Sequence, residues 1–241
     1  MLHKTFIIVA SAAAIFLSAV ALAKPAMTLS PDSLDFGFSP QNQAISCRFW
    51  IRSTGTDTLK IADVRSSCGC TQAPLEKKIV PPGDSTMLEV TLATGQYLGN
   101  VVKSVHISTN TGEPERNVTI STTVLANTDS TSPVIIRPYV LDFSHPQGKN
   151  EMQATFTIQN VASYVLEPRI ISIPDDIFTV KLPKRIKPGK TTEVMVRLKP
   201  NGPPHGFIKS FTIALNDVLK SRFSIPVRGP AIVLTMPPGN H

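Results

Sequence analysis

The residues with the clearest potential for chemistry are two cysteines separated by one glycine, Cys68-Gly69-Cys70. In an extended strand, side chains at i and i+2 share a face and their Cα atoms lie about 6.6 Å apart. That separation is at the outer limit of disulfide geometry, about 4.4–6.8 Å. A disulfide therefore requires a bend, which Gly69 can supply because glycine adopts positive φ at little steric cost. We expect so small a ring to be strained and reducible, as redox-active disulfides are.

The same sulfur pair is compatible with two other roles. In the reduced state, Cys68 and Cys70 would form a soft two-thiolate site suited to Cu(I). A four-ligand zinc site is disfavoured because no Cys-x-x-Cys or His-x-x-x-His spacing completes the set. Alternatively the pair simply closes a loop, with Ser66, Ser67 and Thr71 bonding the local backbone. The oxidising conditions outside the cytoplasm favour the disulfide.

The third cysteine, Cys47, lies in a segment where apolar and polar residues alternate, which predicts a strand. It shares the apolar face and is expected to be a small buried hydrophobe. A turn at Gly55 would, however, bring the start of this strand to the same end of the fold as Cys68 and Cys70. Cys47 could then pair with one of them or supply a third sulfur, and one cysteine must stay unpaired in a monomer.

The N-terminus has the pattern of a secretory signal peptide. A short basic segment ends at Lys4, an uncharged apolar run follows, and Ala21-Leu22-Ala23 provides a small-x-small cleavage site. A retained membrane anchor is the alternative, since the run approaches the ~18 residues that a spanning helix needs. We expect cleavage of residues 1–23 and a periplasmic or secreted mature chain without stable membrane insertion.

The charge of the chain limits its partners. It carries 24 basic and 17 acidic side chains, and loss of Lys4 with the signal peptide leaves 23 against 17. A net charge near +6 predicts modest attraction to anionic envelope polymers or lipid headgroups. Nucleic acid is excluded as a partner, because the protein is expected to be exported and has no nucleic-acid motif.

An internal repeat predicts the architecture. Segments with period-two alternation, separated by Gly- and Pro-rich turns, run through the chain, and no helical periodicity is sustained after residue 23. Leu34-Asp35-Phe36 recurs as Leu141-Asp142-Phe143, and Pro82-Gly83 recurs as Pro188-Gly189. Offsets of ~106–107 residues match the size of an immunoglobulin-like sandwich. The sequence therefore predicts an all-β chain of two tandem immunoglobulin-like β-sandwiches after the signal peptide.

We place the predicted boundaries as follows: signal peptide 1–23, first sandwich with the Cys-Gly-Cys motif 24–127, linker 128–133, second sandwich 134–232 and disordered tail 233–241. The second copy has no cysteine, so the thiol site belongs to the first copy alone.

The first sandwich resembles a bacterial exported family of unassigned function with immunoglobulin-like domains, similar to the ASH and HYDIN domains of ciliary proteins. The similarity spans roughly residues 28–126 and is most specific in Ser67-Cys68-Gly69-Cys70-Thr71. The resemblance implies the fold and export, and it implies no activity. Tandem sandwiches, a signal peptide and a basic chain also describe periplasmic pilus chaperones, an analogy of fold that does not carry function.

These observations favour an exported, non-enzymatic binding or scaffold protein of the cell envelope, with another envelope protein as its partner. No catalytic constellation occurs in the sequence. Cu(I) handling or thiol–disulfide exchange at Cys68 and Cys70 is the first alternative, and a chaperone-like assembly factor of the periplasm is the second.

Overall fold

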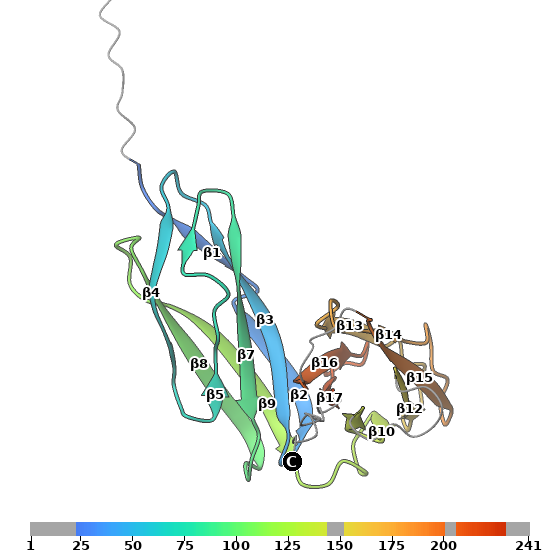
Figure 1. Cartoon of the computed structure of the whole chain (residues 1–241). Coiled ribbons are helices and arrows are strands. Elements are labelled where there is room, and N and C mark those ends of the chain that lie inside the picture. Colours follow the sequence, from blue (N-terminus) through green and yellow to red (C-terminus); the bar gives the residue numbers. More distant parts are fainter. Residues whose placement is uncertain (1–22, 144–151, 201–205, 230–241) are drawn as a thin grey trace, which may run out of the picture.

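The computed structural model describes residues 23–143, 152–200 and 206–229, and these residues form only strands and connecting turns. The all-β prediction is confirmed (Figure 1). None of the described segments is a helix that could span a lipid bilayer. The predicted signal peptide, apart from Ala23, and the predicted tail 233–241 lie outside the described residues.

The first half of the chain forms two facing sheets. Its strands are β1 (Met27–Ser30), β2 (Ser33–Pro40), β3 (Ala44–Ser53), β4 (Leu59–Ser66), β5 (Thr71–Gln72), β6 (Ile79–Val80), β7 (Ser85–Ala93), β8 (Gly99–Thr109) and β9 (Arg116–Leu125). One sheet has the order β1-β3-β7-β5, and the facing strands follow the order β2-β9-β8-β4-β6. Alternating apolar side chains from both sheets, including Phe36, Phe49 and Leu88, fill a core between residues 27 and 124.

The second half repeats this plan with shorter strands. They are β10 (Val134–Arg137), β11 (Leu141–Asp142), β12 (Gln153–Asn160), β13 (Arg169–Ser172), β14 (Phe178–Lys181), β15 (Thr191–Leu198), β16 (Ile208–Ala214) and β17 (Arg222–Arg228). The sheet β10-β12-β15-β14 faces the strands β13-β16-β17. A separate core between residues 134 and 227 contains Phe156, Phe178 and Phe211, so each half has its own hydrophobic interior.

The two sandwiches contact each other through more than the predicted linker. Strand β17 pairs in parallel with β2 at Phe223 and Phe38, which joins strands of both halves into one nine-stranded sheet. The rings of Phe38 and Phe223 are 5.3 Å apart, and Phe38 packs against the second core. The hydroxyl of Tyr139 also donates to the Phe38 carbonyl at 2.8 Å. In Figure 1 the second sandwich packs beside the lower half of the first.

Candidate functional site

Cys68 and Cys70 form a disulfide in the connection between β4 and β5, with their Cα atoms 5.3 Å apart. The predicted reason for the bend is wrong, because Gly69 does not adopt a left-handed conformation. A turn instead shortens the span: the N–H of Thr71 donates to the carbonyl of Cys68 at 3.3 Å. A Cβ placed on Gly69 would meet nothing within 4 Å. The ring therefore does not depend on glycine.

Neighbouring strands hold both ends of the disulfide loop. Ser67 continues the pairing of β4 with β8, since its N–H donates to the Ser104 carbonyl at 2.9 Å and its hydroxyl accepts from the Ser104 N–H at 3.1 Å. On the other side, the N–H of Ala93 on β7 donates to the carbonyl of Cys70 at 2.9 Å. The loop thus bridges the two sheets at one end of the first sandwich.

Hydroxyl groups lie close to both sulfurs, which are half-buried. The Oγ1 atom of Thr71 lies 3.4 Å from Cys68 Sγ and 3.8 Å from Cys70 Sγ. The Tyr97 hydroxyl donates to Cys70 Sγ at 3.5 Å, and Lys103 Nζ lies 5.0 Å from the centre of the Tyr97 ring. Cys70 packs against the first core. The two sulfurs therefore have different surroundings, because the Tyr97 hydroxyl contacts Cys70 Sγ, whereas the Thr71 hydroxyl lies nearer to Cys68 Sγ.

Sequence reasoning did not identify Tyr97 or Lys103 as neighbours of the disulfide. Tyr97 is 27 residues from Cys70, in the turn between β7 and β8. Its position follows from the pairing of β5 with β7, where Thr71 lies opposite Leu92. No local motif encodes that pairing.

Cys47 is a free thiol on β3 and is only 4% exposed. Its side chain lies in the first core, and burial together with the charge of Glu89 raises the pKa of the thiol well above its ordinary value. The disulfide involves only the other two cysteines. The alternatives in which Cys47 pairs with Cys68 or Cys70 are not the arrangement found.

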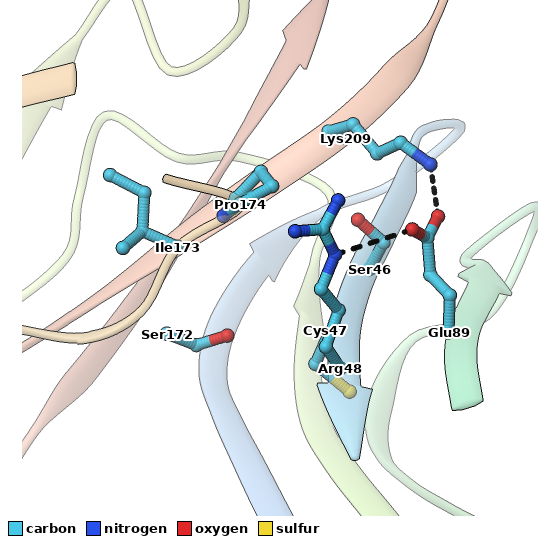
Figure 2. Close-up of a pocket in the computed structure, with 8 residues that line it drawn as sticks. All are labelled: Ser46, Cys47, Arg48, Glu89, Ser172, Ile173, Pro174 and Lys209. Atoms are coloured by element: carbon cyan, nitrogen blue, oxygen red, sulfur yellow. Dashed lines mark hydrogen bonds and ion pairs between the residues drawn. The ribbon is translucent and has the colours of Figure 1, made fainter. Parts of the chain in front are cut away.

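On the opposite face of β3 a charged network crosses between the sandwiches (Figure 2). Glu89 of the first sandwich pairs with Lys209 of the second and lies 3.5 Å from Nε of Arg48. Arg48 makes a two-pronged pair with Asp176, in which Nη2 lies 3.1 Å from Oδ2. Arg48, Glu89 and Lys209 are all largely buried, and the cavity between them is about 10 Å³, close to the size of one water molecule.

A pair of serines joins the sandwiches beside this network. The N–H of Ser46 donates to Ser210 Oγ at 2.8 Å, and that hydroxyl donates back to the Ser46 carbonyl at 3.0 Å. The N–H of Ser210 donates to Ser46 Oγ at 3.2 Å. Both residues are buried, so hydroxyl groups satisfy the outward backbone of β3 where no strand pairs with it.

A groove of about 340 Å³ lies between the sandwiches, and Arg48 also lines it. The first sandwich contributes Leu34 and Trp50, and the second contributes Ile170 to Ser172 of β13 and the adjoining Ile173. Trp50 is 47% exposed and is the only tryptophan in the chain. Sequence analysis did not predict this groove, because it exists only where the two halves meet.

Among the described residues, no group of three or more His, Cys, Asp or Glu side chains could hold a metal ion. A two-sulfur Cu(I) site at Cys68 and Cys70 would require the disulfide to be reduced first, because thiolates are the ligands.

Comparison with known proteins gives a family match for the first sandwich alone. Residues 27–124 match the model of a family described as protein of unknown function (DUF1573). This is the region in which the sequence resemblance lay, and the match brings no activity with it. The comparison with curated proteins gave no match.

Several solved structures share a distant similarity of fold. A protein of unknown function from Porphyromonas gingivalis W83 is 17% identical, covering 85% of this chain and 99% of that chain, with a TM-score of 0.36. The seventh ASH/PapD-like domain of human CEP192 is 7% identical, covering 42% of this chain and 86% of that domain, with a TM-score of 0.36. The C. elegans MSP family member WR4 is 15% identical, with coverage of 42% and 100% and a TM-score of 0.31.

Proposed function

We propose that this chain is an exported, non-enzymatic binding or scaffold protein of the cell envelope. We further propose that it holds an extended segment of another exported protein in the groove between its sandwiches. The observation that carries the proposal is the groove itself, which is lined by Trp50 of the first sandwich and by isoleucines of β13 in the second. Its volume falls within the range of ~300–1,000 Å³ typical of binding sites.

The contacts between the sandwiches support a groove that exists before a partner arrives. The Arg48–Glu89–Lys209 network and the Ser46–Ser210 pair fix the two walls relative to each other. A preformed site avoids the entropic cost of ordering its walls on binding.

The free edge of β13 supports an extended occupant. Among the residues that the structure describes, β13 pairs with β16 alone, and it is the terminal strand of its sheet. An added strand can bond to such an edge through its backbone, while its alternate side chains enter neighbouring pockets. Ile170, Ile171 and Ile173 are half-exposed there, which favours apolar side chains in the partner.

Affinity capture from envelope extracts tests the proposal. The wild-type mature chain is compared with Ile171→Asp, which introduces a charge in the groove. The matched control is Val102→Asp, because Val102 is 62% exposed on the first sandwich and does not line the groove. We expect one reproducible partner that Ile171→Asp loses and Val102→Asp retains. A partner retained equally by both variants would refute the groove as the binding site.

The chaperone-like alternative uses the same groove and differs in the lifetime of the complex. A scaffold keeps its partner in the mature envelope, whereas an assembly factor releases it. Pulse–chase capture distinguishes the two, since only an assembly factor loses its labelled partner with time.

A second candidate function is thiol–disulfide exchange, favoured by the different surroundings of the two sulfurs. A thiolate of a partner dithiol would attack Cys68 Sγ and form a mixed disulfide. The Cys68–Cys70 bond breaks, and its electron pair goes to Cys70, where the Tyr97 hydroxyl can stabilise the thiolate. The second partner thiolate then displaces Cys68, so the partner dithiol becomes a disulfide and this chain becomes a dithiol.

Equilibration with glutathione tests this second function. A hydrogen bond to a charged group contributes about 1.5–3 kcal/mol, which corresponds to about 30–60 mV for a two-electron couple. Tyr97→Phe should therefore make the potential more negative by about 30 mV or more. An unchanged potential would remove Tyr97 from the exchange step.

The copper alternative is tested separately. The reduced wild-type chain, Cys68→Ser and Cys70→Ser are each titrated with Cu(I) against a competing chelator. Equal copper affinity in all three chains would rule out a Cu(I) site at this cysteine pair.

A further inference from the structure

One end of the second sandwich carries an unusual group of exposed apolar side chains. It is formed by the segment 161–167 after β12 and the hairpin 216–220 between β16 and β17. Val218 is 96% exposed and Leu219 is 86% exposed, both at the tip of the hairpin. The exposed apolar residues of this loop end are Val161, Tyr164, Val165, Val218 and Leu219.

Basic side chains surround these residues. The segment 184–190 runs beside 161–167, and its four basic residues are all exposed. Lys220 adds a fifth beside Leu219. The loop end thus has the following exposed basic residues: Lys184, Arg185, Lys187, Lys190 and Lys220. Its acidic residues are Glu167, which is paired with Arg185 at 2.8 Å, and Asp217, which is buried and bonded to Ser221.

Buried hydrogen bonds fix the three segments together. Asn160 is fully buried, and its Nδ2 donates to the carbonyls of Tyr164 and Ile186 at 2.8 and 2.9 Å. The N–H of Glu167 donates to Asn216 Oδ1 at 2.8 Å, which ties the first segment to the hairpin. The apolar tips therefore project from an ordered base.

The first sandwich provides an internal comparison, because the same frame recurs there. The N–H of Lys60 donates to Asn110 Oδ1 at 2.8 Å, as Glu167 does to Asn216. In the first copy, however, polar residues or glycine stand at the positions of all five exposed apolar residues. The equivalents of Val161, Tyr164 and Val165 are Thr54, Asp57 and Thr58. The equivalents of Val218 and Leu219 are Gly112 and Glu113. The corresponding segments 54–60, 78–84 and 110–114 hold two basic and three acidic residues, against five and two in the second copy. The fold alone does not require an apolar and basic loop end.

We propose that this loop end docks the protein on an anionic lipid surface. Apolar tips rimmed by lysine and arginine suit the boundary between headgroups and acyl chains, where apolar burial and attraction to anionic lipid act together. Val218 and Leu219 enter the interface, Tyr164 lies at headgroup level, and the basic rim contacts the lipid phosphates. The attachment is peripheral and separate from the groove, so it does not depend on the identity of the groove's partner.

Sedimentation with vesicles tests the proposal on the mature chain. Phosphatidylcholine vesicles with and without phosphatidylglycerol are compared for the wild-type chain, the double variant Val218→Ser/Leu219→Ser and the control Leu98→Ser/Val102→Ser. Both control residues are 62% exposed but lie on the first sandwich. Because all four side chains are largely in solvent, the variants should keep the fold, and circular dichroism checks this.

We expect binding to vesicles that contain phosphatidylglycerol, weakened by salt, and at least a tenfold lower partition coefficient for Val218→Ser/Leu219→Ser. The control variant should bind as the wild type does. Equal binding of both variants would overturn the proposal, as would wild-type binding that does not depend on anionic lipid. Failure of the wild type to bind any vesicle would overturn it too, and would point to a protein partner for these residues.

Discussion

Replacement of Ser210 by alanine tests the contact that fixes the two sandwiches. The Ser210 hydroxyl satisfies both the N–H and the carbonyl of Ser46, at 2.8 and 3.0 Å. Both serines are buried, so the substitution leaves the N–H and the carbonyl of Ser46 without the hydroxyl partner in a buried interface. Each such group costs about 1–3 kcal/mol. For two such groups, we expect Ser210→Ala to destabilise the chain by about 2–6 kcal/mol, a large share of the ~5–15 kcal/mol typical of a native protein.

Urea unfolding followed by two probes measures this effect. The fluorescence of Trp50 reports on the groove and the first sandwich, whereas far-ultraviolet circular dichroism reports on both halves. With a slope of about 1–3 kcal/mol per M, the midpoint should fall by about 1 M or more. The two probes should also separate, because the sandwiches no longer unfold together.

The repeat supplies a matched control. Ser104 occupies the position of Ser210 in the first sandwich, and its contacts with Ser67 use its backbone groups. Ser104→Ala should therefore change stability by less than about 0.5 kcal/mol. Equal midpoints for Ser210→Ala and Ser104→Ala would refute the argument that the hydroxyl holds the interface.

Three further predictions concern the charged network and the cysteines. The hydrogen bond and charge of Arg48 lower the pKa of the Asp176 carboxyl. The stability that this carboxylate contributes is therefore complete above about pH 4 and is lost as the pH falls further. In Asp176→Asn, the urea midpoint of unfolding should fall less steeply on the acid side than in the wild type. Gly69→Ala should still form the disulfide and change the unfolding free energy by less than about 1 kcal/mol, because a Cβ has free space there; a lost disulfide by mass spectrometry would contradict this. Cys47 is buried, so alkylation of the native chain should add no group before reduction and two groups after it, as measured by intact mass.

The strands and their buried faces could be predicted from the sequence, because they depend on the local alternation of apolar and polar residues. Ile45, Phe49 and Ile51 are fully buried in β3, as the period of two indicates. The repeat correctly predicted that the second half has the same strand plan as the first. The alternation of apolar and polar residues is read within one strand, and the repeat is read by comparing the two halves of the sequence. Neither requires knowledge of which segments meet in space.

The contacts between the two sandwiches could not be predicted from the sequence. Ser46 and Arg48 alternate outward on β3, which predicts exposure to water, yet the second sandwich covers both. A polar residue on a strand has the same pattern whether water or another sandwich lies against it. The groove at Trp50 and the surroundings of Cys70 depend on such long-range placement, so neither has a signature in the sequence.

Photo-cross-linking from position 50 in living cells tests whether an exported protein occupies the groove. A photoreactive amino acid replaces Trp50 in the groove, and a second chain carries it in place of Val102 outside the groove. We expect one reproducible adduct with an exported protein from position 50, mapped to an extended apolar segment, and none of that mass from position 102. The absence of any adduct at position 50, or the same adducts at both positions, would contradict this expectation.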